Sequence, residues 1–425
     1  MKAENIQDIY ELSPAQQGIL FHTLSSPDSG VYFVQLQCSL KGHFDIVAFE
    51  NAWRQVVARH AALRTSFHWE NLEKPLQVVH QEVKLPLRQQ DWRGIAPAEQ
   101  QKRLETLLES DRHKGFDLSQ PPLLRLSLIQ LTDYSYQFVW SKHHLILDGW
   151  STALVLKEFS ELYEALSHNQ DKSLVPSRSY GEYIGWVQQQ DLSKAETFWR
   201  RVLSGIKAPT PLIKLNIDKF SSQEDRYDEQ FLKLSTETTA ALQSLAKQRR
   251  LTLNTLVQGA WAVLLSRYSG DEEVVYGNTV SGRPADLVGI GSMVGMFINT
   301  LPVRVKVDAE QSLVSWLKQL QAQLAEMRQY EYSPLVEVKK WSEAPQSLPL
   351  FESIIVFENY PVSQVIQDQK TNLEVQNVSS VERTNYPLTV MVLPDRELEL
   401  KISYQCSRFI ATTISRMLGH FQVLL

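Results

Sequence analysis

The sequence predicts an α/β protein built from two lobes. Its 425 residues are too many for one ordinary hydrophobic core, which favours two domains. Segments with strand-like alternation of apolar and polar residues are interleaved with segments of helical periodicity, a mixture typical of α/β architectures. A polar stretch without clear periodicity, residues 168–178, separates the two halves. We therefore expect an N-terminal lobe at residues 1–175 and a C-terminal lobe at residues 176–425.

The first half alternates between predicted strands and helices. Residues 32–40 alternate between apolar and mostly polar side chains, which predicts a half-buried strand. Asp45 is a predicted helix cap, and the apolar residues after it fall at helical spacing up to about His60. The same reasoning predicts further strands and one more helix, at residues 65–69, 124–128 and 134–140 for the strands and 149–166 for the helix.

The second half repeats this mixture. Apolar stripes predict helices at residues 251–268, 313–327 and 409–421, and alternation predicts strands at residues 353–357 and 398–404. The last helical pattern is still running at Leu425, and no cap residue closes it. We therefore expect a truncated last helix and a chain cut from a longer polypeptide.

The composition excludes several classes of protein. Hydrophobic residues make up 43% and charged residues 21% of the chain, as in soluble globular proteins. The net charge of -5 and the lack of a basic block argue against nucleic-acid binding. No apolar stretch is long enough to cross a bilayer, and the first ten residues do not resemble a signal peptide. Two cysteines, Cys38 and Cys406, make neither a disulfide framework nor a zinc site. We expect packed thiols and a reducing cytoplasm.

Familiar catalytic loops are missing or imperfect. Residues 289–295 begin like a dinucleotide-binding loop, but the third glycine comes one position late, as in an ordinary flexible loop. The sequence has no Gly-x-Ser-x-Gly elbow and no Gly-x-x-x-x-Gly-Lys phosphate loop. A covalent serine or cysteine nucleophile therefore has no support.

The run His-His-Leu-Ile-Leu-Asp-Gly at residues 143–149 is the candidate site. Adjacent side chains on a strand point to opposite faces, so one histidine should be structural and the other functional. Most histidines in proteins are simply packed and hydrogen-bonded, and a metal site lacks further ligands here. Asp148 can hold a turn or pair with a cation, and Gly149 allows close approach of a ligand to the backbone.

This run matches the HHxxxDG motif of condensation domains of nonribosomal peptide synthetases. Residues 59–67 resemble the RHExLRTxF motif, with Ala61 in place of the usual glutamate, and residues 294–304 resemble the VGxFVNT region. Looser matches follow the family's order at residues 12–22, 180–186, 330–335 and 385–388. Because these matches span nearly the whole chain, it is identified as a member of this family.

The resemblance implies a V-shaped pseudo-dimer of two chloramphenicol acetyltransferase-like lobes around a central tunnel. It implies an acyltransferase of secondary-metabolite biosynthesis, which transfers a donor aminoacyl or peptidyl thioester to the amine of an acceptor aminoacyl thioester. Both substrates are carried on phosphopantetheine arms of an upstream and a downstream peptidyl carrier protein, with an adenylation domain adjacent. No cofactor or metal belongs to the domain itself.

The resemblance also assigns roles within the motif. His144 is the catalytic histidine, either as the general base or as the group that positions the amine, and His143 is structural. The backbone of Gly149 lies near the reacting carbonyl, unless this glycine only serves the turn that starts the following helix.

Other residues are expected to support the site. Asp148 is expected to form a structural salt bridge with Arg64. Trp150 and Ser151 complete the usual DGWS sequence and are expected at the tunnel or substrate. Asn299 either lines the tunnel or holds a turn.

Related activities fit the sequence less well. A heterocyclisation domain would carry an aspartate pattern in place of the two histidines, and the residues after Gly149 usually differ in epimerisation domains. The motifs lean slightly toward domains that take a D-configured donor residue. Two rivals come from other classes, a docking module that only positions carrier proteins and a free-standing acyltransferase that uses coenzyme A. The sequence identifies neither the donor nor the acceptor amino acid.

Overall fold

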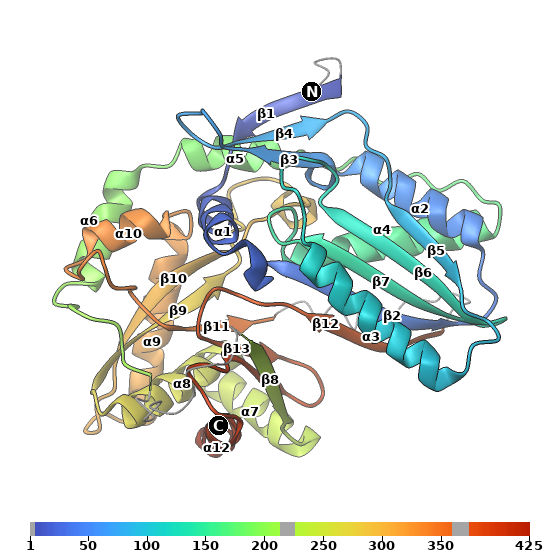
Figure 1. Ribbon diagram of the computed structural model, residues 1–425. Helices are drawn as coiled ribbons and strands as arrows, with labels where there is room; N and C mark the ends of the chain where they lie inside the picture. The colour runs from blue at the N-terminus through green and yellow to red at the C-terminus, as the bar shows by residue number, and fades with distance from the viewer. Residues whose placement is uncertain (1–4, 213–225, 359–373) are drawn as a thin grey trace. The chain divides into compact units, whose positions relative to one another are not determined.

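The computed structural model describes residues 5–212, 226–358 and 374–425, which form two compact units (Figure 1). The units do not follow the linear order of the chain. The first comprises Met1–Gln189, Arg283–Phe297 and Tyr360–Arg383, and the second comprises Gln190–Gly282, Ile298–Asn359 and Thr384–Leu425. Three segments of the predicted C-terminal lobe thus belong to the first unit, namely residues 176–189, Arg283–Phe297 and Tyr360–Arg383.

A five-stranded sheet with the order β12-β2-β7-β6-β5 forms the centre of the first unit. Neighbouring strands in this sheet pair antiparallel, except for β5 and β6, which pair parallel. The structure confirms the strands predicted near residues 32–40, 124–128 and 134–140. The strands are β2 (Phe33–Lys41), β5 (Leu87–Asp91), β6 (Leu124–Thr132), β7 (Ser135–His143) and β12 (Glu374–Val381).

Helices cover both faces of this sheet (Figure 1). On one face, α2 (Ile46–Arg59) packs beside α4 (Gly149–Ser167), and the Trp53 ring of α2 contacts the Trp140 ring of β7 at 5.0 Å between centroids. On the other face, α3 (Pro97–Lys114) lies along β2, where the Gln35 amide donates to the Leu108 carbonyl. Asp45 caps α2, as predicted, because its carboxylate accepts from two backbone N–H groups of the first turn.

A smaller sheet with the order β1-β4-β3 completes the first unit, together with α1 (Pro14–Ser25) and α5 (Tyr180–Gln188). Ser13 and Gln16 form a capping box at the start of α1, which satisfies two backbone donors at that end of the helix. The strands are β1 (Ile6–Glu11), β3 (Thr65–His68) and β4 (Leu76–His80).

The second unit is built on a six-stranded mixed sheet with the order β10-β9-β11-β13-β14-β8. Its strands are β8 (Tyr227–Lys233), β9 (Glu273–Val280), β10 (Asn299–Lys306), β11 (Ser353–Phe357), β13 (Leu388–Leu393) and β14 (Glu399–Gln405). Its helices are α6 (Leu192–Val202), α7 (Thr236–Arg249), α8 (Leu253–Ser269), α9 (Leu313–Met327), α10 (Leu335–Trp341) and α12 (Ala411–Leu424). The predicted elements of this half, three helices and two strands, are confirmed as α8, α9, α12, β11 and β14.

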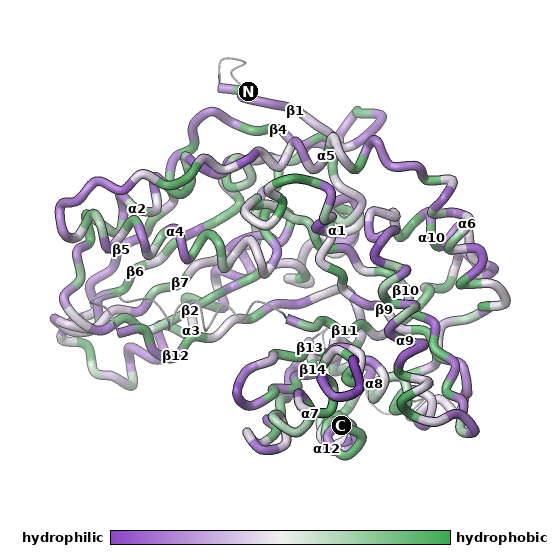
Figure 2. The backbone as a smooth tube through the Cα atoms, turned by 180° about the vertical axis from the view of Figure 1, so that it is seen from behind, coloured by the Kyte–Doolittle hydropathy of each residue, from purple (hydrophilic) through white to green (hydrophobic). Residues whose placement is uncertain are grey.

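Hydrophilic and hydrophobic residues alternate over short distances along the chain (Figure 2), as expected for helices and strands with one buried and one exposed face. Among the described residues, no helix is both long and apolar enough to span a membrane. Both cysteines are free thiols. Cys38 is buried in β2, and this burial raises the pKa of its thiol to about 12, whereas Cys406 is partly exposed just after β14.

Candidate active site

The loop between β7 and α4 carries the double histidine, and it is fully buried from His143 to Asp148. We call residues 143–148 the motif loop. His143 is the last residue of β7, and Asp148 is the residue that caps α4. The Gln16 amide of α1 donates to the Leu145 carbonyl at 2.9 Å, and this contact holds the turn. Residues 12–22, the first of the matches to the family's motifs, therefore support the motif loop through Gln16.

His143 is held as a neutral imidazole. Its Nδ1 atom accepts from the Leu145 backbone N–H at 3.2 Å, and its Nε2 atom lies 3.4 Å from the Thr23 hydroxyl of α1. Burial, together with the neighbouring His144, lowers the pKa of His143 to about 3. A ring with both nitrogens placed in this way, and with so low a pKa, suits a structural role.

His144 has different neighbours. Its Nε2 atom lies 3.0 Å from a carboxylate oxygen of Glu382, and the Tyr32 ring meets the imidazole edge to face. Burial disfavours the imidazolium, but the charge and hydrogen bond of Glu382 outweigh burial, so the pKa of His144 is raised above its usual value. His144 is thus a buried imidazole that gains a proton easily.

Asp148 is completely buried, and it connects the loop to a distant segment of the chain. One carboxylate oxygen accepts from the Ser151 N–H at 2.7 Å, and the other accepts from the Phe297 N–H at 3.0 Å. Its ion-pair partner is Arg283, at 3.5 Å. Burial lowers the pKa of the Arg283 guanidinium, and Asp148 opposes this shift.

The predicted salt bridge between Asp148 and Arg64 is therefore wrong. The Arg64 guanidinium donates instead to the backbone carbonyls of Val57, His80 and Gln81 and to the Gln7 side chain. These acceptors gather where β4 ends, beside the three-stranded sheet, and they satisfy the guanidinium without a carboxylate.

Ser151 and Trp150 bind the segment that follows Arg283. The Ser151 hydroxyl donates to the Gly295 carbonyl at 2.8 Å and accepts from the Gly295 N–H at 3.1 Å. The Trp150 indole N–H donates to the Gly291 carbonyl at 3.0 Å. The loop at residues 289–295, which only resembles a dinucleotide loop, is thus packed against the motif.

Gly295 is needed for this close approach. A Cβ atom at this position would lie 2.2 Å from the Tyr180 ring of α5, a distance that real Cβ atoms do not show. Glycine therefore lets residues 294–297 pack between the motif and α5, where Met296 and Phe297 are buried.

Gly149 and Asn299 are each the first residue of a regular element. Gly149 is the half-buried first residue of α4. Asn299 lies in the second unit, at the start of β10, and its amide donates to the backbone carbonyls of Glu331 and Ser333 at 2.9 and 2.8 Å. The Asn299 side chain thus holds the turn at residues 331–333.

Sequence reasoning missed Glu382 and Arg283. Glu382 follows a polar edge strand, and no motif marks it. Arg283 stands before the recognised residues 294–304, and its pairing with Asp148 depends on tertiary structure. A search for a buried cation to neutralise Asp148 would have had several arginines to choose from.

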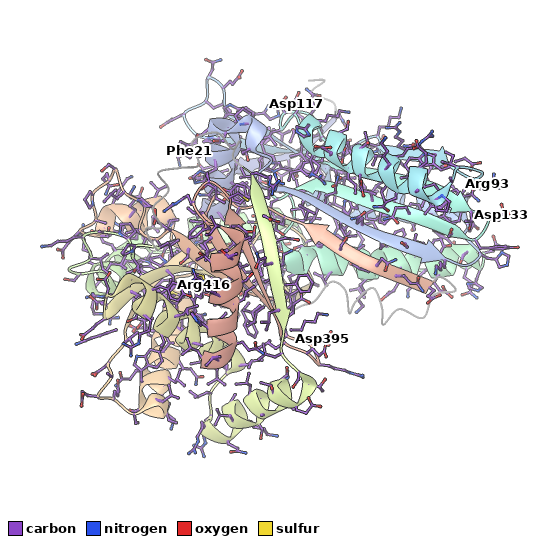
Figure 3. The ribbon with its side chains drawn as sticks, turned by 60° about the horizontal axis from the view of Figure 1, so that its bottom comes forward. Phe21, Arg93, Asp117, Asp133, Asp395 and Arg416 are labelled. Atoms are coloured by element: carbon purple, nitrogen blue, oxygen red, sulfur yellow. The ribbon has the colours of Figure 1, made fainter. Side chains whose placement is uncertain are left out.

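One charged cluster far from the motif loop is a surface feature. At the end of the sheet opposite His143, Arg93 pairs with Asp91 and Asp133 in an exposed group (Figure 3). Within the described parts of the chain, no group of three or more His, Cys, Asp or Glu side chains is placed to hold a metal ion. The motif loop is therefore the site to explain.

Comparison with known proteins gives a consistent picture. The family model described as "Condensation domain" matches residues 6–425. One of the linear gramicidin synthase proteins of Brevibacillus parabrevis is 46% identical over 422 residues, which cover 99% of this chain and 5% of that protein. Bacitracin synthase 1 of Bacillus licheniformis is 35% identical over 98% of this chain and 8% of that protein. The chain spans only a small part of the length of these curated relatives.

Solved structures share the fold. A variant of the starter condensation domain of rhizomide synthetase, in complex with C8-CoA, has a TM-score of 0.82 at 19% identity, over 98% of this chain and 94% of that one. The X-domain from teicoplanin biosynthesis, in complex with OxyB, has a TM-score of 0.78 at 22% identity, over 100% of this chain and 93% of that one. The predicted α/β fold is confirmed.

Proposed function

The chain belongs to the condensation-domain family of nonribosomal peptide synthetases, and from this membership we propose that it joins two carrier-bound thioesters through a peptide bond. A donor aminoacyl or peptidyl group leaves the phosphopantetheine arm of an upstream carrier protein. The acceptor is the amine of an aminoacyl thioester on a downstream carrier protein. The observation that carries the proposal is His144, a buried imidazole of raised pKa in the HHxxxDG sequence.

The chemistry needs little machinery. A thioester is already activated, and an α-amine with an ordinary pKa of about 7.7–8.0 is partly uncharged near neutrality. Holding the amine beside the carbonyl supplies much of the acceleration, since well-oriented groups reach effective concentrations of about 10⁵ M or more. The buried motif loop supplies a rigid, dry support for this placement.

The attacking amine must also lose a proton, and His144 accepts it. The amine nitrogen attacks the thioester carbonyl, so that a C–N bond forms. The tetrahedral intermediate then collapses, the C–S bond breaks, and the electron pair leaves with the sulfur. The imidazole of His144 takes the proton that the nitrogen loses and returns it to the departing thiolate. Gly149 lets the reacting carbonyl approach the backbone at the start of α4.

The partners follow from this reaction. The phosphopantetheine arms arrive with the carrier proteins, and the domain itself contributes side chains and backbone without a cofactor of its own. An adenylation domain supplies the aminoacyl groups. A reducing cytoplasm is the compartment that we propose, in agreement with two free thiols.

The direct test mixes the protein with a donor-loaded and an acceptor-loaded carrier protein and measures the product on each arm by intact-protein mass spectrometry. We expect a dipeptide on the acceptor arm, and donors of L and D configuration should be compared, with the D donor slightly preferred. Carrier binding without product, for several donor pairs, would favour a docking module. Product formed from a coenzyme A thioester without any carrier protein would favour a free-standing acyltransferase.

A further inference from the structure

We infer that Glu382 is a positioning residue for this reaction, which holds His144 and stabilises the imidazolium that His144 forms when it takes the proton of the acceptor amine. The inference rests on the proposed function. It adds to the site a carboxylate that lies outside the HHxxxDG run and more than two hundred residues after it in the sequence.

The contact itself has the geometry of a charge-assisted hydrogen bond. The His144 Nε2 atom lies 3.0 Å from a Glu382 oxygen, with 8% of the histidine side chain and 32% of the glutamate side chain exposed. A carboxylate can only accept, so Nε2 must carry the hydrogen. The neutral ring with its hydrogen on Nε2 and the imidazolium both make this contact, so the proton that His144 gains goes to Nδ1. The bond to the carboxylate is charge-assisted, and such bonds are roughly twice as strong as bonds between neutral groups.

The backbone aligns the two partners through Tyr32. The Tyr32 N–H donates to the Arg383 carbonyl at 2.8 Å, and the Tyr32 carbonyl accepts from the His144 N–H at 2.8 Å. Tyr32 adopts a φ of 63°, a left-handed conformation that is unfavourable for a bulky residue. The fold thus keeps a strained residue at the point that fixes Glu382 relative to His144.

The strand that delivers Glu382 is also irregular. β12 pairs antiparallel with β2, and its register shifts between Gln376 and Ser379, with Asn377 at a φ of 52°. Irregularities of this kind often redirect side chains beside active sites. Val381 makes the last pair with β2, and Glu382 follows immediately, at the end of the sheet where His143 lies.

Several groups act on the charge of His144, and Glu382 decides the balance. Burial and the ammonium of Lys142 on β7 both disfavour the imidazolium, and His143 stays neutral with a pKa of about 3. Tyr32, before β2, contributes an uncharged ring. The Glu382 carboxylate outweighs the opposing groups. Without this carboxylate, burial alone would make His144 a weaker base.

The chain contains a second buried histidine paired with a carboxylate, which serves as a control. His60 lies 2.7 Å from Glu158 of α4, and Glu158 is also bound by Arg59 at 2.9 Å. This pair lies outside the motif loop. Glu158→Gln therefore removes the same chemical contact without touching His144.

The test compares wild type, Glu382→Gln and Glu158→Gln in the carrier-protein assay between pH 5.5 and 8.5. Loss of the Glu382 carboxylate should lower the pKa of His144. Because a base is active only when deprotonated, the rising limb of the pH–rate profile should then move to lower pH. The plateau should fall by roughly tenfold, less than the loss of about a hundredfold or more expected without the imidazole. In Glu158→Gln the rising limb of the pH–rate profile should stay at the same pH as in wild type.

An NMR titration of His144 in the same proteins gives an independent readout, with the signal assigned from His144→Ala. The pKa of His144 should be lower in Glu382→Gln than in wild type. An unchanged His144 titration in folded Glu382→Gln, or an unchanged limb in active protein, overturns the inference. A wild-type protein that makes no peptide would count against the proposed function instead, and the titration would still decide the pairing.

Discussion

His143 and His144 are neighbours in the chain, but burial and partners shift their pKa values in opposite directions. Both rings are buried, which favours the neutral form, and His144 has the Glu382 carboxylate beside it. The alternation of strand side chains predicts different surroundings for the two rings. It does not predict which ring meets a carboxylate, because Glu382 arrives from a strand that pairs with β2.

The low pKa of His143 predicts acid sensitivity of the fold. In the unfolded chain His143 has an ordinary pKa of about 6.5, whereas in the folded protein its pKa is about 3. Between these two pH values only the unfolded chain binds the proton, so the free energy of unfolding falls as the pH drops through this window. In His143→Asn the amide oxygen can replace Nδ1 as acceptor, and this variant should lose part of that dependence. Urea unfolding at pH 4.5 and 7 measures it.

His113→Asn, which changes an exposed histidine of α3, is the matched control and should keep the wild-type pH dependence. If His143→Asn loses as much stability between the two pH values as wild type does, His143 does not carry this effect.

At the scale of elements, the start of α4 depends on a segment that comes much later in the chain. Asp148 caps the helix and at the same time binds the Phe297 N–H and Arg283. The helix and its cap could be predicted from sequence, because Asp148 directly precedes a helical stripe. Its cation could not, because the pairing joins residues that only the tertiary structure brings together.

Asp148→Ala should lower the free energy of unfolding by about 3–5 kcal/mol, because it leaves the Arg283 guanidinium buried without its counter-ion. Chemical denaturation of a double-mutant cycle identifies the partner. Asp148→Ala and Arg283→Met should be clearly non-additive, whereas Asp148→Ala and Arg64→Met should add. Coupling to Arg64 in place of Arg283 would contradict the structure.

Elements with strong periodicity were predictable, and polar ones were not. β2, α2, β7 and α9 direct most of their large apolar residues to one face, so these residues recur at strand or helix spacing. β12 has the sequence EVQNVSSV, is largely exposed and contains a register shift, so neither its pattern nor its composition signals a strand. The site residue that depends on β12 was missed for the same reason.

At the scale of the whole molecule, the first unit is discontinuous in sequence. Residues 1–189 supply most of it, but the edge strand beside β2 and the cation for Asp148 come from later segments. The polar linker at residues 168–178 cannot reveal this. Its composition indicates an exposed segment, but it does not indicate that later segments of the chain pack against the first unit.

A fragment of residues 1–189 should therefore fail to fold cooperatively, because it lacks β12 and the segment Arg283–Phe297. Without them, one edge of β2 is unpaired and Asp148 is buried without Arg283. Thermal melting followed by circular dichroism compares the fragment with the full 425-residue chain. A cooperative transition of the fragment near the temperature of the full chain would show that the later segments are dispensable.

The central claim is that His144 takes the proton during peptide-bond formation, and single-turnover kinetics test it most directly. Wild type and His144→Ala are each mixed with loaded donor and acceptor carrier proteins, and dipeptide on the acceptor arm is followed by rapid quench. We predict a loss of about 10²–10⁴-fold in the rate for His144→Ala, with unchanged melting temperature and carrier binding. Dipeptide formation at the wild-type rate in folded His144→Ala protein would contradict the claim.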